Sequence, residues 1–274
     1  MTDISPIDPT LCVVTRFSFF GKSGWKSDFS QNTELLFEDD RLNGRLDLLR
    51  RIHLPSLAAQ TSQNFHLFVL TSANLPAWAL KQLTQQCHEA LGYDAVSIVA
   101  AAPGPARKYL RQFVSRRYGS RPHAQIVLDD DDGLASDFLA SVNDELKNFR
   151  ADTELPKFLT FPLGYGMVHS NDGPVLLFRH HYPFINLGLT MITTPQLKNI
   201  LAIDHKGMPK RRGFRICRAD VPMFVRSVHQ ANDSRVEVGP NWVPVTRPEA
   251  DADLRERFAW LRMSDTREAT VKRN

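Results

Sequence analysis

The sequence predicts an α/β fold in which a mostly parallel central sheet is flanked by helices and a mixed second half shares the core. Two observations lead to this prediction. Along residues 1–132, short apolar runs alternate with segments of helical periodicity, in the order β-α-β-α-β-α-β. In addition, His66–Ser72 is a largely apolar run of the kind that parallel sheets bury on both faces.

The elements of the first half follow from these two periodicities. Leu42, Leu46 and Leu49 recur at helical spacing, and the arginines of the same segment lie on other faces. Runs rich in β-branched and aromatic residues predict strands. We expect strands at Leu11–Phe20, His66–Ser72, Ala95–Ala100 and Ala124–Leu128, and helices over 41–60, Ala77–Leu91 and about Pro105–Tyr118.

The second half is less regular. The turn residues at 170–173 separate two apolar runs, which predicts a pair of strands. We expect strands at Phe158–Val168, Pro174–His180 and Ile185–Thr194, and helices at Pro195–Ile203, Met223–Gln230 and Leu254–Met263. No linker stands out, so residues 1–250 are expected to form a single domain with halves 1–132 and 133–250. Residues 251–274 would add a C-terminal helix and a frayed tail.

Composition narrows the class of protein. Hydrophobic residues make up 42% and charged residues 23% of the 274 residues, which excludes disordered and coiled-coil proteins. The net charge of +4 is too small and dispersed to indicate a nucleic-acid partner. Three cysteines without C-x-x-C spacing, no signal peptide and no long apolar run predict a cytoplasmic protein without a transmembrane segment. Peripheral contact with a membrane is left open.

The strongest chemical feature is the segment IVLDDDDGL, where an apolar strand ends in Asp129, Asp130, Asp131 and Asp132. Ligands of open α/β sheets bind beyond the carboxyl ends of the strands. In an extended chain Asp129 and Asp131 would share one face and form an oxygen site for Mg²⁺ or Mn²⁺. The alternative is a solvated acidic turn in which Asp132 caps a helix that begins near Leu134.

Basic residues are the second feature. Arg107 and Arg111 lie one helical turn apart in the segment before the acidic strand, where they would meet phosphates held by a metal. For each of them taken singly, a solvated helix face is the better explanation. Arg16 interrupts an apolar strand, and a charge there requires a partner. That partner is either a ligand phosphate or base, or a carboxylate of the protein.

His229 is the third feature, because it ends an apolar stretch and is followed by Asn232 and Asp233. Imidazole is a suitable third ligand for a Mn²⁺ ion that two carboxylates hold, although a single histidine is more often a packed or surface residue. The sequence contains no motif of the other common catalytic or nucleotide-binding classes. GKSG at 21–24 lacks P-loop spacing, no G-x-G-x-x-G follows the first strand, and His180-His181 does not match H-E-x-x-H.

Three blocks together resemble one family. They are the R-L-x-x-R…L-P-S-L-x-x-Q…F block of residues 41–65, LDDDDGLASDF at 128–138, and the V-H-x-x-N-D-S block of 228–234. This combination is similar to the putative rhamnosyltransferases, a family of GT-A-like glycosyltransferases. The resemblance covers about Arg16 to Ser234. One departure is Val127, which stands where relatives often have Arg.

The resemblance implies a GT-A-like fold whose first half (1–132) binds a nucleotide sugar and whose second half (133–250) completes the metal site and binds the acceptor. Asp129 and Asp131 match the D-x-D pair, Asp132 its usual neighbour, and His229 the late histidine of the metal site. Arg16, Arg107, Arg111, Asp129 and Asp130 are then the expected contacts of the nucleotide sugar.

The expected function is a Mn²⁺- or Mg²⁺-dependent transfer of a sugar, rhamnose by the family's name, from a nucleotide diphosphate donor to a hydroxyl of a glycan or other acceptor. The expected general base is Asp204, which follows an apolar segment and precedes His205 and a glycine-containing loop. Two alternatives remain open. One is a non-catalytic nucleotide- or carbohydrate-binding module of the same fold, and the other is a nucleotidyltransferase.

Overall fold

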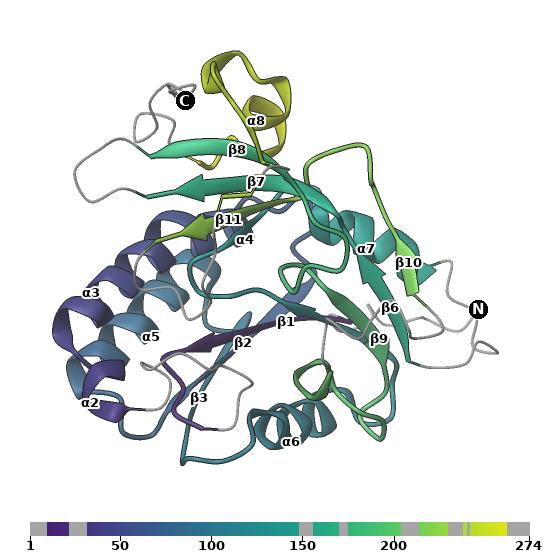
Figure 1. The fold of residues 1–274 in the computed structure, drawn as a ribbon. Coiled ribbons are helices and arrows are strands. Elements are labelled where there is room, and N and C mark those ends of the chain that lie inside the picture. Colours follow the sequence, from purple (N-terminus) through teal and green to yellow (C-terminus); the bar gives the residue numbers. More distant parts are fainter. Residues whose placement is uncertain are drawn as a thin grey trace.

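The computed structural model describes residues 10–21, 32–147, 156–169, 175–203, 214–229, 238–239 and 242–261, and the statements below concern these residues. They form two sheets with helices around them (Figure 1). The larger sheet has seven strands in the order β10-β6-β9-β4-β1-β2-β3, and the smaller has five in the order β12-β8-β7-β11-β5. Both the α/β class and the mostly parallel central sheet are therefore confirmed.

The larger sheet contains the strands of the first half. β1 lies between β2 and β4 and is parallel to both, and β2 is parallel to β3. The second half adds β9, which is antiparallel to both β4 and β6, and then β10, which is parallel to β6. The strand bounds are β1 Leu11–Phe17, β2 Phe65–Ser72, β3 Val96–Ala101, β4 His123–Val127, β6 Lys157–Thr160, β9 Thr190–Thr193 and β10 Phe214–Ile216.

Helices cover both faces of this sheet, because successive residues of β1 point to opposite sides. Leu11 and Val13 belong to the hydrophobic cluster that includes residues of α3, α4 and α5, whereas Cys12 and Val14 pack with residues of α6. Figure 1 shows α3 and α5 on one side of β1–β3 and α6 on the other. The helices are α2 Thr33–Leu36, α3 Asp39–Leu48, α4 Leu54–Ala58, α5 Ala77–Leu91 and α6 Ala106–Tyr118.

The helix expected over residues 41–60 is not uniform. Between α3 and α4 the chain forms a π-helical segment, η1 (Leu49–His53). Pro55, at the start of α4, has no N–H to continue an α-helical ladder, and its ring would crowd the carbonyl of Arg51. The wider π-helical turn includes Arg51 and so lies at the place where this clash would occur in a regular α-helix.

The smaller sheet comes mostly from the second half, and its strands are β5 Gly133–Leu134, β7 Leu163–Val168, β8 Leu176–His181, β11 Phe224–Val228 and β12 Trp242–Pro244. β7 and β8 are antiparallel, which confirms the expected strand pair. β11 runs parallel to β7 and antiparallel to β5. The sheet thus connects β5, which follows the four aspartates, to the strand that precedes His229.

The helix predicted at Met223–Gln230 is wrong, because residues 224–228 form strand β11. Phe224, Val225 and Val228 favour strands, and β7 offers an edge with which the segment pairs along its whole length. The strand predicted at Phe158–Val168 divides into β6 and β7, which belong to different sheets. Pro162 lies between them, and proline cannot donate to a sheet ladder.

Other boundaries also differ. The helix expected near Leu134 is absent at that place, since β5 comes first and α7 begins only at Phe138. The helix expected at Pro195–Ile203 is reduced to the 3₁₀ turn η2, and the strand expected at Ile185–Thr194 to β9. The described part of the C-terminal segment holds a 3₁₀ turn and a shorter helix than expected. These elements are α7 Phe138–Lys147, η2 Ile200–Ala202, η4 Pro248–Ala250 and α8 Ala252–Arg257.

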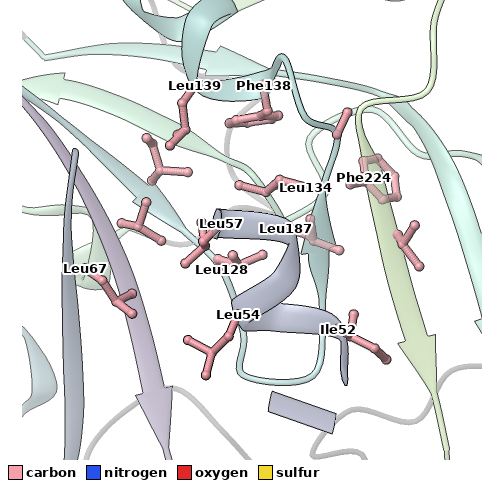
Figure 2. Packing of buried hydrophobic residues seen from close by; sticks show 14 of the residues in the cluster. Ile52, Leu54, Leu57, Leu67, Leu128, Leu134, Phe138, Leu139, Leu187 and Phe224 are labelled. Atoms are coloured by element: carbon pink, nitrogen blue, oxygen red, sulfur yellow. The ribbon is translucent and has the colours of Figure 1, made fainter. Parts of the chain in front are cut away.

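One hydrophobic cluster joins the two sheets. Figure 2 shows Leu134, Phe138, Leu187 and Phe224 packed close to Leu57 of α4. Three residues beyond position 250 belong to the same cluster: Leu254, Phe258 and Leu261. The predicted domain boundary at 250 stays a prediction. Within the described ranges, no helix combines the length and the apolar character needed to cross a bilayer.

Candidate functional site

Asp129–Asp132 form a turn at the carboxyl end of β4, which we call the acidic turn. The N–H of Asp132 donates to the carbonyl of Asp129 at 3.1 Å, so the chain reverses here instead of continuing as a strand. The face-sharing expected from an extended chain therefore does not apply. Each of the four carboxylates instead has an environment of its own.

The Asp130 side chain is fully buried and is bound by Arg45 of α3. Arg45 Nε donates to Asp130 Oδ2 at 2.9 Å, and Arg45 Nη2 donates to Oδ1. Burial raises the pKa of Asp130 to about 6, although the Arg45 charge opposes the shift. Both oxygens of Asp130 bind Arg45 and neither is exposed, so neither is open to the nucleotide-sugar contact that the sequence predicts for this residue. The pair holds α3 against the acidic turn.

Asp131 and His229, two of the residues that the sequence predicts to bind a metal, lie together. His229 Nε2 lies 2.8 Å from Asp131 Oδ2, across 98 residues of sequence. Arg45 Nη1 is 3.9 Å from the same oxygen. Burial would raise the pKa of Asp131, but the Arg45 charge and the hydrogen bond from His229 outweigh it and lower the pKa to about 2. Asp131 is therefore a carboxylate at neutral pH.

Asp129 faces Arg16, whose Nη2 lies 3.5 Å from Asp129 Oδ1. The Arg16 side chain is 7% exposed and that of Asp129 32%, so Asp129 is the aspartate of the turn that is most open to a ligand. Of the two kinds of partner that the sequence left open for Arg16, a carboxylate of the protein is thus present. Below the turn, His53 Nδ1 donates to the Asp129 carbonyl at 3.0 Å, and burial lowers the His53 pKa to about 4.

Asp132 ties the acidic turn to the smaller sheet. Its Oδ1 accepts a hydrogen bond from the backbone N–H of Ser227 in β11 at 2.9 Å. Burial, together with the charges of Asp131 and Asp129, raises its pKa well above the usual range. Asp132 does not cap a helix, since β5 follows it directly. The alternative reading of the motif as a solvated helix cap is therefore wrong.

The sequence reasoning missed three residues beside the turn. Arg45 was placed on a helix face away from the leucines but is 3% exposed, and no local pattern marks it as buried. His53 had no signal of its own. His169 follows β7, and its ring meets that of His229 edge-on with centroids 6.2 Å apart. Burial and the neighbouring His229 lower the pKa of His169 to about 4.

The structure does not bring the remaining predicted residues to this place. Arg107 and Arg111 are exposed on α6, and among the described residues neither contacts the acidic turn. Asp204 lies outside the described residues, so its assignment as general base stays a prediction. Within the same described ranges, no three His, Cys, Asp or Glu side chains gather as a complete metal-binding group.

Sequence comparison decides the family. The family described as "Putative rhamnosyl transferase" matches residues 10–240, which include every element around the acidic turn. The chain belongs to this family. Membership confirms the resemblance carried by the three sequence blocks. No curated protein matches it.

Several solved structures are similar at low sequence identity. Residues 1–349 of TarS from S. aureus align at a TM-score of 0.43 and 10% identity, covering 80% of this chain and 60% of that one. HddC from Yersinia pseudotuberculosis aligns at a TM-score of 0.41 and 12% identity, covering 76% of this chain and 89% of HddC. The inositol-1-phosphate CTP transferase from T. maritima aligns at a TM-score of 0.38 and 12% identity, covering 84% of this chain and 94% of the transferase. The chain thus spans 60% of the TarS chain that it matches.

Proposed function

We propose that the protein is a metal-dependent glycosyltransferase that moves a sugar from a nucleotide diphosphate donor to an acceptor hydroxyl. One observation carries the proposal. His229 lies 2.8 Å from Asp131, at the carboxyl end of a parallel strand, although 98 residues separate them. The family's name supports rhamnose as the sugar. No residue of the acidic turn distinguishes one sugar from another.

The side chains at this place fit a divalent cation. Adjacent ligands of an octahedral ion at about 2.1 Å are roughly 3 Å apart, close to the separation of His229 Nε2 and Asp131 Oδ2. In addition, Nε2 of the neighbouring His169 is buried and has no hydrogen-bond partner among the described residues. Mg²⁺ usually takes one or two carboxylates, with water and substrate phosphates as its other ligands, so an incomplete protein set suits it.

Asp131 and His229 would hold the ion. A bound Mn²⁺ or Mg²⁺ would supply Lewis-acid stabilisation of the negative charge on the departing nucleoside diphosphate. Asp129 is the most exposed carboxylate of the turn and would face the donor, with Arg16 beside it. Asp132, bound to Ser227, would keep β11 and therefore His229 in register with the turn.

The remaining roles belong to positioning. Arg45 fixes Asp130, and the neutral His53 accepts from Thr15 at 3.4 Å while donating to the Asp129 carbonyl. These contacts fix the position of the acidic turn and leave the Asp129 side chain partly exposed to solvent. Asp204 remains the proposed general base for the acceptor hydroxyl.

The test is a thermal-shift panel of nucleotide sugars with and without Mn²⁺, followed by product analysis. A donor at 100 times its Kd is expected to add about 2.7 kcal/mol of stability, and only with the metal present. The Asp131→Asn variant is expected to lose this metal-dependent shift, whereas the exposed control Glu249→Gln keeps it. The expected product of turnover is a free nucleoside diphosphate.

Three results would contradict the proposal. Pyrophosphate release would indicate a nucleotidyltransferase. Donor binding without turnover across an acceptor panel would favour the non-catalytic module. An unchanged donor shift in Asp131→Asn would remove the acidic turn from the donor site.

A further inference from the structure

One helix, α6, is rich in positive charge. α6 carries five basic residues and no acidic one: Arg107, Lys108, Arg111, Arg116 and Arg117. The whole chain has a formal charge of +4, so the rest of the chain amounts to +4 minus +5, or −1. The glycosyltransferase proposal uses none of these five charges.

Four of the five side chains point into solvent. Arg107, Lys108, Arg111 and Arg116 are exposed, and we call them the basic face of α6. The opposite side of the helix is buried against the sheet through Ala106, Leu110, Val114 and Tyr118. Among the described residues, no carboxylate pairs with any member of the basic face. The charge is therefore available to an external partner.

The shape and composition of the basic face favour a flat anionic surface over a nucleic acid. Single-stranded nucleic acids stack their bases on exposed aromatic rings. The two aromatic residues in the middle of α6 are directed inward instead: Phe113 packs on His66 and Phe68, and Tyr109 packs on Phe19. What remains outside is a set of cations between positions 107 and 116, a span of about 14 Å along the helix.

The position of α6 relates it to the candidate site. α6 begins shortly after β3 ends, and the acidic turn follows the end of β4. β3 and β4 belong to the same set of parallel strands, so both ends lie at one edge of the sheet. Arg107, Lys108 and Arg111 are in the first half of the helix and thus lie toward that edge. A surface bound there would lie near the edge that carries the acidic turn.

We propose that the basic face of α6 docks the protein on an anionic phospholipid bilayer. No apolar side chain lies among the exposed residues 107, 108, 111, 112, 115 and 116, so attachment is electrostatic and without insertion. Each Lys or Arg near an anionic membrane surface strengthens binding by about fivefold, and salt screens the attraction. This inference is independent of the proposed glycosyltransferase activity.

The test uses the full chain and sedimentation with phosphatidylcholine vesicles, with and without phosphatidylglycerol. Binding is expected only to the anionic vesicles and is expected to disappear near 0.5 M salt, where the Debye length is about 4 Å. The Lys108→Gln/Arg116→Gln variant should bind about 25-fold more weakly while turnover of a water-soluble acceptor is unchanged. The matched control Arg50→Gln/Arg255→Gln removes the same charge from two other exposed positions and should change binding less than about twofold.

Four results would overturn the inference. One is equal binding to neutral vesicles, and another is an equal loss in the control variant. A third is tighter binding of a single-stranded RNA oligonucleotide than of the vesicles, when the Lys108→Gln/Arg116→Gln variant also loses the RNA binding. That result would make nucleic acid the partner. The fourth concerns Arg107→Gln/Arg111→Gln. If this variant keeps vesicle binding but loses affinity for the nucleotide sugar, the two arginines belong to the donor site.

Discussion

The acidic turn and the basic face of α6 are both runs of like charge beside a strand, yet the structure treats them differently. The turn is folded into the protein, where Arg45, His229, Ser227 and Arg16 each contact one of its aspartates. The basic face of α6 is exposed on the other side of the sheet (Figure 1). The difference teaches that burial, not charge density, decides whether partners within the protein fix such a run in place.

The physical reason is the cost of removing a charge from water. A buried carboxylate needs a partner at a definite place, so the acidic turn specifies the positions of α3, β1 and β11. An exposed cation is screened within about 10 Å and specifies nothing about its neighbours. The comparison therefore predicts large effects for changes at the turn and small effects at the basic face.

The largest effect is expected from breaking the Arg45–Asp130 pair. Arg45→Met leaves a carboxylate buried without its cation, which typically costs about 3–5 kcal/mol of unfolding free energy. Urea denaturation measures the loss. The exposed pair Arg50–Asp47 serves as the control, and Arg50→Met is expected to cost less than about 1 kcal/mol. Similar losses of unfolding free energy in Arg45→Met and Arg50→Met would contradict the distinction between buried and exposed charges.

The buried side of α6 should show a pH-dependent effect that its basic face lacks. His123 packs on Tyr118, and burial lowers its pKa from 6.5 to about 4. The imidazole must be neutral, because its Nε2 accepts from Gln125 Nε2 at 2.8 Å while Gln125 Oε1 accepts from Ile200. The unfolded chain binds a proton below pH 6.5 and the folded chain does so only below about 4. Stability is then lost as the pH falls from 6.5 toward 4.

This loss amounts to about 3 kcal/mol for a shift of this size. His123→Gln should remove this contribution, so the stability difference between the wild type and the variant should shrink across the same pH range. Chemical denaturation at several pH values measures that difference. A constant difference from pH 7 to pH 4 would show that folding does not shift the pKa of His123.

The next effect is on metal binding rather than on folding, and it is expected at the Asp131–His229 pair. Loss of an outer partner of a metal ligand typically weakens metal binding by 10–100-fold, so replacing a ligand itself should exceed about 100-fold. His229→Ala should therefore weaken Mn²⁺ binding by at least that factor, as followed by the electron paramagnetic resonance of free Mn²⁺. The exposed His181→Ala is the control. Equal Mn²⁺ affinity in both variants would exclude His229 as a ligand.

The smallest effect is expected at the basic face itself. Lys108→Gln/Arg116→Gln removes two exposed cations without a carboxylate partner among the described residues, so the unfolding free energy should change by less than about 0.5 kcal/mol. Thermal denaturation checks this. A loss comparable with that of Arg45→Met would mean that the basic face stabilises the fold.

Local patterns were sufficient for the first half of the fold. Helix α5 has the bounds that its periodicity predicts, and β2 begins one residue before its expected start. The position of the four aspartates at the end of a strand could also be predicted, because an apolar run that stops at a charge is visible within nine residues. The second half was predicted less well, since its strands are short and depend on distant partners.

What local patterns could not determine is which groups meet. Residues 224–228 form a strand because β7 supplies their hydrogen bonds, and that edge is about 60 positions away in the chain. Arg45 lies 85 residues from Asp130, and nothing in its neighbourhood marks it as buried. Charge and periodicity are properties of a short segment and can be read from it. Burial and pairing depend on the whole packed chain, and these decided that Asp131 meets His229 while Arg107 and Arg111 face solvent.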